Sequence, residues 1–420
     1  MQGLGAAGLA AAGLGTAGCV TGGSGSESSG SSTLTLQSSL VDPNSSGAMQ
    51  KLVDLYNERG GEASLNTVAA DTFNAQLPTY LDSDNPPDVM VYFAGAITQR
   101  YGDRDKLLDV SQLWADELSE YPDSLRELST DSKDRQIFVP TNYYWWGVFY
   151  RRSVFDQLGA TVPTTWTDYL TLCEEIQAQG MAPLITGAGR DPWPLVAWFD
   201  YLNLRINGAE FHRALLRGEH RFDGPEVKAV FTEFAKVLPY FHPSSRSYAY
   251  QEAITPFAQG DAAMYLMGAL ITDVLPDDVD DLDFFQFPIL DPGVPVAEEA
   301  PTNGYLAPAR VRDPDATRDL LGFLASDEAQ VIYCRDSQSS SVPTSPTADT
   351  SWTSELVQKG LDLLGVADDL TQFFNRDSSE ELQQTAYTAC SRFLAEPGNV
   401  DAILAEWQAA AEPIWQDQSA

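Results

Sequence analysis

Four aromatic residues follow one another in the middle of the chain, and their types suit one kind of chemistry. They are Tyr143, Tyr144, Trp145 and Trp146. Flat rings cover the apolar face of a sugar, while polar neighbours such as Asn142 bind its hydroxyls. The segment therefore predicts a carbohydrate-binding surface. The alternative is a core strand with one exposed ring, because large rings also dominate the energetics of hydrophobic cores.

A second aromatic candidate, Trp193, stands between two prolines in the glycine- and proline-rich stretch 187–194. This composition is typical of a loop, and loops with ordered large rings often carry binding residues. Asp191 lies two positions earlier and offers a carboxylate to the same site. The alternative is that Trp193 fills a gap in the core.

Metal and cofactor chemistry finds little support in the sequence. The four cysteines contain no C-x-x-C pair, and the three histidines show no metal-ligand spacing. The aspartate-rich stretch 277–283 lacks the spacing and the closing glutamate of a calcium loop. No G-x-x-x-x-G-K-[ST] motif for nucleotide phosphates is present. We therefore expect no metal ion and no cofactor.

The composition and net charge limit the classes of partner that the protein can bind. A chain of 420 residues with 43% hydrophobic residues is a globular protein with more than one domain. Its 60 acidic and 25 basic residues give a net charge of −35, which argues against nucleic acid as a partner. Lysine is also scarce relative to arginine. We interpret this acidic surface as an adaptation to high salt.

The N-terminal segment resembles a secretion signal. Residues 1–18 are uncharged, rich in alanine, glycine and leucine, and end in Thr-Ala-Gly before Cys19. The pattern is similar to a lipobox, which predicts lipidation of Cys19 and a Gly/Ser-rich tether up to residue 33. The usual basic residues are missing, so either translation starts upstream of Met1 or the signal interpretation is wrong. No later apolar run reaches the ~18 residues of a membrane span.

The first globular part alternates strands and helices. Strands are expected at 34–37, 65–68 and 89–93, with helices at 48–58 and 71–81 between them. This βαβαβ order indicates an α/β layer fold. Ligands of open α/β sheets bind beyond the carboxyl ends of the strands, which places Tyr92 and the following residues 93–95 near a cleft.

The later part of the chain also contains both predicted helices and predicted strands. A capping box at Thr165 predicts a helix with Trp166 and Cys173 on its apolar face. Further elements are expected as a helix over 107–128, a strand from 140 to 152, a helix over 251–259, strands over 262–268 and 282–288, a turn at 302–305, and helices starting at 314 and 327.

Several short motifs, taken in order, resemble the family 1 extracellular solute-binding proteins, the sugar-capturing components of ABC importers. No single motif is decisive, but their number and order cover Leu34 to the C-terminus. They are Pro87-Asp88-Val89, Pro140-Thr141-Asn142 with its aromatics and Gly147 to Tyr150, Pro163 to Trp166, Gln259 to Met264, Phe287-Pro288, Asn303-Gly304-Tyr305, Ser326 to Gln330, and Phe374 to Asp377.

The resemblance implies an α/β fold of the class II periplasmic-binding-protein type, with two interleaved lobes joined by hinge strands. Lobe 1 would comprise 34–143 and 284–335, and lobe 2 would comprise 144–283 and 336–420. The hinges are expected near Tyr144, Asp283 and Ser337.

The resemblance also implies ligand contacts at matching positions. Relatives often have a carboxylate near Tyr144 or Gly95, where this chain has no charge, so the identity of the sugar stays open. The predicted ligand-binding residues are Tyr92, Asn142, Tyr144, Trp145, Asp191, Trp193, Met267, Gly268, Asn303, Gly304, Arg376 and Asp377.

The implied function is capture of a sugar or oligosaccharide by closure of the cleft and its delivery to ABC permease subunits. The protein is expected to be a monomer, lipid-anchored at the outer face of the cell membrane, and not an enzyme. A surface glycoside hydrolase is one alternative, although only Asp191 and Asp377 pair acids with the aromatic segments. A ligand-capture protein for a sensory receptor is the other. Cys334 and Cys390 are left open as a disulfide pair.

Overall fold

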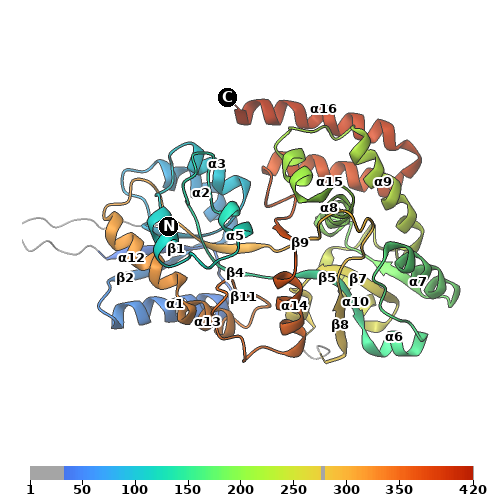
Figure 1. Ribbon diagram of the computed structural model, residues 1–420, viewed down its shortest axis with the longest axis horizontal. Coiled ribbons are helices and arrows are strands. Elements are labelled where there is room, and N and C mark those ends of the chain that lie inside the picture. The colour runs from blue at the N-terminus through green and yellow to red at the C-terminus, as the bar shows by residue number, and fades with distance from the viewer. Residues whose placement is uncertain (1–32, 276–279, 420) are drawn as a thin grey trace, which may run out of the picture. The chain divides into compact units, whose positions relative to one another are not determined.

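The computed structural model describes residues 33–275 and 280–419 (Figure 1). The predicted signal, Cys19 and all of the tether except its last residue lie outside the described residues, as does part of the acidic stretch 277–283. Within the described ranges, none of the helices has the length and apolar character needed to cross a membrane.

The first lobe is built around a six-stranded sheet with helices packed on it (Figure 1). Its elements are β1 (Leu34–Ser38), α1 (Pro43–Glu58), β2 (Ala63–Thr67), α2 (Ala70–Asp82), β3 (Val89–Phe93), α3 (Ala96–Asp103), α4 (Ser111–Asp116), α5 (Asp123–Leu128), β4 (Val139–Tyr143), β10 (Thr302–Leu306), α12 (Pro314–Ala325), α13 (Asp327–Asp336) and β11 (Val342–Pro343).

The order of this sheet is β11-β4-β10-β3-β1-β2. β1 pairs in parallel with β2 and β3, which confirms the predicted βαβαβ start. β10 comes from much later in the chain and lies antiparallel between β3 and β4. The lobe is therefore completed by a segment that returns to it, as interleaved lobes require.

The second lobe contains a four-stranded sheet of order β6-β7-β5-β8 and a two-stranded sheet of β9 and β12. Its elements are β5 (Trp146–Arg151), α6 (Arg152–Leu158), α7 (Trp166–Ala178), β6 (Ala182–Ile185), α8 (Trp193–Leu216), α9 (Pro225–Val237), η1 (Leu238–Tyr240), α10 (Tyr250–Gln259), β7 (Ala262–Gly268), α11 (Ile271–Val274), β8 (Leu282–Phe285), β9 (Ala297–Glu299), α14 (Glu355–Gly365), β12 (Asp369–Thr371), α15 (Glu380–Ala395), η3 (Pro397–Asn399) and α16 (Val400–Ser419).

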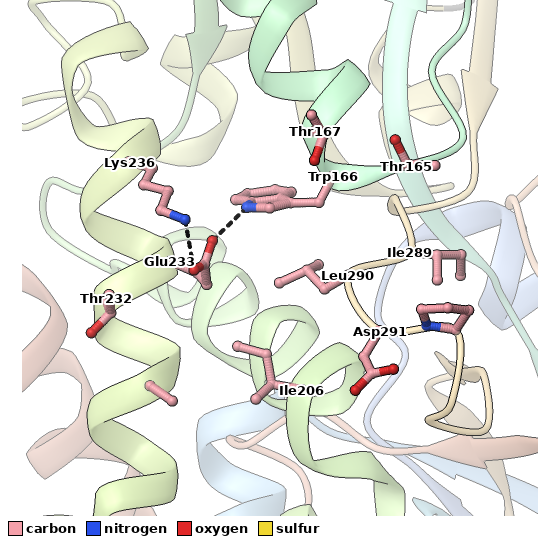
Figure 2. A pocket seen from close by; sticks show the side chains of 12 residues that line it. Thr165, Trp166, Thr167, Ile206, Thr232, Glu233, Lys236, Ile289, Leu290 and Asp291 are labelled. Carbon is pink, nitrogen blue, oxygen red and sulfur yellow. Dashed lines mark hydrogen bonds and ion pairs between the residues drawn. The ribbon is translucent and has the colours of Figure 1, made fainter.

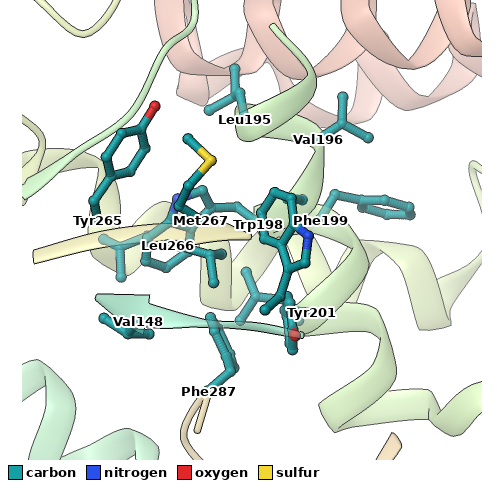
Figure 3. Close-up of a cluster of buried hydrophobic side chains, with 14 of the residues drawn as sticks. Val148, Leu195, Val196, Trp198, Phe199, Tyr201, Tyr265, Leu266, Met267 and Phe287 are labelled. Carbon is teal, nitrogen blue, oxygen red and sulfur yellow. The ribbon is translucent and has the colours of Figure 1, made fainter. Parts of the chain in front are cut away.

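Two large hydrophobic cores hold these elements together. One contains buried residues of 34–139 and 305–334, and the other contains buried residues of 145–300 and 342–415. The second core is rich in rings, and Figure 3 shows Trp198, Phe199 and Tyr201 of α8 gathered over β5 and β7. The expected two-lobe α/β architecture is confirmed.

The aromatic segment 140–152 differs from the single strand that we expected. Tyr143 ends β4 in the first sheet, and Trp146 begins β5 in the second sheet. Only Tyr144 and Trp145 lie between the two strands. The four rings therefore sit where the chain passes from one lobe to the other.

Three other expectations were wrong in detail. Residues 107–128 form two short helices, α4 and α5, because Pro122 stands between them. Residues 302–306 form strand β10 instead of a turn. Phe284, Phe285 and Phe287 belong to the second core, so the sequence-based boundary that gave residues 284–300 to the first lobe is corrected.

The three cysteines within the described residues are free and buried. Cys334 lies in the core of the first lobe and Cys390 in the core of the second, so these two do not form a disulfide. Cys173 lies on the buried face of α7, as the helical pattern predicts.

Candidate functional site

A chain of polar side chains connects the lobes at the ends of β4 and β10. Arg376 of the second lobe donates a hydrogen bond to Asn303 Oδ1 over 2.9 Å. Asn303 in turn donates to Asn142 Oδ1 over 3.0 Å. The two asparagines face each other because β10 pairs antiparallel with β4 in that register. Three of the predicted residues are therefore brought into direct contact.

Aromatic rings surround this polar chain. The guanidinium carbon of Arg376 lies 5.4 Å from the ring centre of Phe93 and 5.9 Å from that of Tyr144. Phe93 stacks on Tyr92 with ring centres 4.1 Å apart. Burial raises the pKa of both the Tyr92 and the Tyr144 phenol, so both remain neutral hydroxyl groups at ordinary pH. Rings beside a fixed cation and two amides form a surface suited to a polyhydroxylated ligand.

A groove of about 640 Å³ lies against Tyr92 and Phe93 and is lined by both lobes. Its first-lobe wall includes Ile97, Arg100 and Tyr101 of α3 and the C-cap of that helix, Arg104. Its second-lobe wall comes from residues 375–383, which follow β12 and begin α15. This volume lies within the range of small-molecule sites in proteins.

A second aromatic group belongs to the second lobe. Trp193 is half-buried, with its ring centre 5.7 Å from Trp146 and 5.0 Å from Tyr250. A Cβ atom at Gly268 would come within 2.6 Å of Trp146 and 2.9 Å of Tyr144, so only glycine lets these rings approach β7. Tyr144, Trp193 and Gly268 therefore lie in one neighbourhood.

The surroundings of Trp193 differ from the expected loop. Residues 193–216 form α8, and the tryptophan stands in its first turn after Pro192. Proline next to the start of a helix is favourable, so the proline pair that suggested a loop marks a helix start. Asp191 lies just outside, largely exposed, with its carboxylate 3.9 Å from Arg190.

Trp145 and Met267 lie apart from this neighbourhood. Both are fully buried. A Cβ atom at Gly360 of α14 would come within 2.2 Å of the Trp145 indole, which shows how closely helix and ring pack. Met267 lies in the cluster of Figure 3 with Leu195 and Trp198. Both side chains belong to the core of the second lobe, and Met267 alternates with Gly268 along β7.

Gly304 has a packing reason to be glycine. A Cβ atom there would come within 2.0 Å of the Val139 carbonyl oxygen of the adjacent strand. The register between β10 and β4 also shifts at Asn303 and Gly304. The residue lets the two strands approach and so fixes Asn303 beside Asn142.

Several residues of this region carried no recognisable sequence signal. Phe93 was expected only to lie near a cleft, and Tyr250 stands at the start of α10 without a motif of its own. Two buried acids, Asp200 and Glu299, were missed entirely. Among the described residues, neither Glu299 carboxylate oxygen nor Asp200 Oδ1 has a hydrogen-bond partner.

Burial dominates the titration of these acids. It raises the pKa of Asp200 and of Glu299 well above the ordinary range, and their mutual proximity to Asp377 raises the pKa of both further. His212 lies 4.0 Å from Asp200, but burial lowers the pKa of its imidazole to about 3, so it brings no positive charge. Burial therefore favours the neutral form of both acids.

We expect the free energy of unfolding to rise as the pH falls from neutral toward about 5, because the folded protein binds these protons while the unfolded chain, titrating near about 4, does not. The stability contributed by Asp200 and Glu299 is complete below the unfolded pKa and is lost as the pH rises through the raised folded pKa. Urea denaturation between neutral pH and about pH 5 measures the slope of the free energy of unfolding against pH. Glu299→Gln should flatten it, and the exposed Asp71→Asn should not; equal slopes for all three proteins would contradict the assignment.

A separate cavity of about 630 Å³ lies in the second lobe between α7, α8, α9 and residues 289–292. In Figure 2 the Trp166 indole donates to Glu233, which also binds Lys236. None of the predicted ligand residues lines this cavity. Within the described residues, no group of three or more His, Cys, Asp or Glu side chains is arranged to hold a metal ion.

The comparisons with known proteins agree with this architecture. Residues 42–331 match the model of a family described as bacterial extracellular solute-binding protein. An uncharacterised ABC transporter extracellular-binding protein of Pyrococcus horikoshii is 24% identical over 263 residues, which is 61% of this chain and 58% of that protein. A probable sugar-binding periplasmic protein of Mesorhizobium japonicum is 26% identical over 152 residues, or 35% of each chain.

Among solved structures, the bacterial solute receptor AcbH, described as having an exclusive preference for β-D-galactopyranose, superposes with a TM-score of 0.86. The superposition covers 91% of this chain and 99% of that chain at 24% sequence identity. At this identity the likeness establishes the fold. The matched stretch spans less than two thirds of the length of the Pyrococcus protein.

Proposed function

The chain belongs to the family of bacterial extracellular solute-binding proteins, and from this premise we propose that it captures a sugar or oligosaccharide between its lobes, at the rings and polar side chains that adjoin the groove at Tyr92 and Phe93. Proteins of this family are binding receptors and not enzymes, so the glycoside-hydrolase alternative is set aside. The proposed ligand contacts are Tyr92, Asn142, Tyr144, Trp193, Gly268, Asn303 and Arg376.

The observation that carries the proposal is the position of Arg376. Its guanidinium group lies near two rings, Phe93 and Tyr144, and it is already oriented by its bond to Asn303. A charged donor bonds a hydroxyl oxygen more strongly than a neutral donor does. Sugar hydroxyls would bind to this cation and to the asparagines, while the rings cover the C–H faces.

The same geometry supports closure of the lobes on the ligand. The 640 Å³ groove has one wall on α3 and the other on residues 375–383, so a ligand that contacts both walls favours the form in which they are close. We propose that this loaded form is recognised by the permease subunits of an ABC importer. Lipidation at Cys19 would hold the protein at the outer face of the cell membrane, and the acidic surface would suit high salt.

The proposal predicts a sugar-dependent stabilisation that Arg376→Ala reduces. A thermal-shift screen of galactose, galactose-containing disaccharides and longer oligosaccharides, in both molar and low salt, identifies the ligand. A true ligand at 100 times its Kd should stabilise the protein by about 2.7 kcal/mol. Removing a charged hydrogen bond of about 2 kcal/mol weakens binding roughly 30-fold. Titration calorimetry with the sugar found in the screen measures that loss.

The matched control is Arg318→Ala on α12, which removes an arginine bonded to Asp109 and Asp315 within the first lobe. It should leave sugar affinity unchanged. Equal affinity of the Arg376→Ala variant and the unaltered protein would remove Arg376 from the site. The absence of a shift with every sugar in both salt conditions would contradict the proposed ligand class.

A further inference from the structure

Helix α3 begins without a cap of its own. Its N-cap position is Gly95, which has no side chain to accept a hydrogen bond from the first turn. The first N–H groups of a helix have no partner inside the helix, and a side-chain oxygen usually satisfies one of them. The first turn of α3 therefore needs an acceptor from another part of the chain.

Asp377 of the second lobe provides this acceptor. The backbone N–H of Ala96, the first residue of α3, donates to Asp377 Oδ1 over 2.7 Å. Asp377 is held in place by its own backbone N–H, which donates to the Phe373 carbonyl over 2.8 Å, and Phe373 is buried in the core of the second lobe. The cap of a first-lobe helix is thus anchored in the other lobe.

Gly95 is fitted to this contact in two ways. Its φ of 109° lies in the region that favours glycine, and a Cβ atom there would come within 2.7 Å of Asp377 Oδ1. Because Gly95 has no side chain, the Asp377 carboxylate can come close to the backbone at the start of α3.

The contact affects the groove because α3 forms its wall. Ile97, Arg100 and Tyr101 of this helix, with its C-cap Arg104, line the 640 Å³ groove. Asp377 is buried, with one carboxylate oxygen committed to Ala96. This commitment to the helix separates Asp377 from the ligand contacts that the sequence suggested for it.

We propose that Asp377 is a positioning residue, a cap supplied across the lobes that holds the α3 wall of the groove against the second lobe without touching the ligand. Its importance for binding rests on the proposed function of the groove. The contact between Asp377 and Ala96 does not rest on that proposed function, so it is tested in the absence of any sugar.

The test compares ligand-free full-length variants by small-angle X-ray scattering and by hydrogen exchange of the α3 amides. In Asp377→Ala the radius of gyration should increase, and protection of the first-turn amides should fall about fivefold, the factor that corresponds to a cap of about 1 kcal/mol. Asp377→Asn keeps an oxygen that accepts from Ala96 and should restore most of both properties. Ala96→Pro removes the donor at a position where proline is tolerated, and should reproduce the Asp377→Ala result.

Asp313→Ala is the matched control, because Asp313 caps α12 within the first lobe through the N–H of Ala316. It should expose α12 amides and leave the radius of gyration unchanged. Unchanged scattering in both Asp377→Ala and Ala96→Pro would overturn the proposal, as would an equal expansion in Asp313→Ala. If Asp377→Ala does not fold, Ala96→Pro decides by the same two measurements. None of these outcomes depends on which ligand the protein binds.

Discussion

Replacing Arg205 by alanine is expected to remove about 4 kcal/mol of unfolding free energy, because it breaks a buried ion pair. Arg205 lies on α8 with 2% of its side chain exposed, and it pairs with the fully buried Glu298. It also donates to the Phe287 and Ala297 carbonyls. Alanine would leave Glu298 a buried acid with only Tyr201 and Gln286 as donors. Burying a charge without its partner is far costlier than losing an exposed pair.

Urea denaturation measures this loss as a shift of the midpoint at constant slope. Arg59→Ala is the control, since Arg59 and Glu328 form a pair in which both side chains are about half exposed, and it should cost less than about 1 kcal/mol. The double change Arg205→Met with Glu298→Met should recover most of the stability, because apolar side chains of similar size replace a buried pair at little cost. An unchanged midpoint for Arg205→Ala would contradict the assignment.

Trp193→Ala is expected to weaken sugar binding by about 2 kcal/mol, roughly 30-fold, with little change in the stability of the empty protein. The ring is half-buried and packs on Trp146 and Tyr250 at the start of α8. The ring is therefore supported by two others while part of its surface stays exposed, which suits stacking on a sugar face. Calorimetric titration with the sugar from the screen gives the affinity, and thermal unfolding without sugar gives the stability.

Trp198 on the same helix is the matched control, because it has no exposed surface and packs against Phe234, Phe241 and Phe287. Trp198→Ala should cost about 3–5 kcal/mol of stability, the usual penalty for emptying a core site. A Trp193→Ala variant that loses stability like Trp198→Ala and keeps its affinity would assign Trp193 to the core.

The fold followed from patterns that act locally. The apolar run at β3 and the alternation of strands and helices before it predict a parallel sheet, and the structure contains one. Thr165 and Asp168 form the predicted cap of α7, with a distance of 3.2 Å between the Asp168 amide and Thr165 Oγ1. Such features depend on neighbours within a few positions, so the sequence alone is enough to find them.

The site was harder to predict because it depends on pairings across the chain. Asn142 and Asn303 are 161 positions apart in the sequence, and they meet only because β10 inserts beside β4. Trp145 and Tyr144 are neighbours in sequence, but Trp145 packs against Gly360 of α14 while Tyr144 lies beside Gly268 of β7. Nothing in their residue types predicts this difference. Asp200 and Glu299 are ordinary acids in sequence, and only folding takes them out of water.

The passage of the chain from β4 to β5 has a mechanical consequence. The two strands are clamped by hydrogen bonds to different sheets, so any rotation between the lobes must be taken up in the few residues that join them. The hinge that the sequence predicts near Tyr144 lies in this crossing, whereas Arg104, the C-cap of α3, lies in the wall of the groove. If the lobes rotate about the crossing, contacts near Tyr144 would keep almost the same geometry, and contacts at the groove wall would depend on how far the lobes have closed.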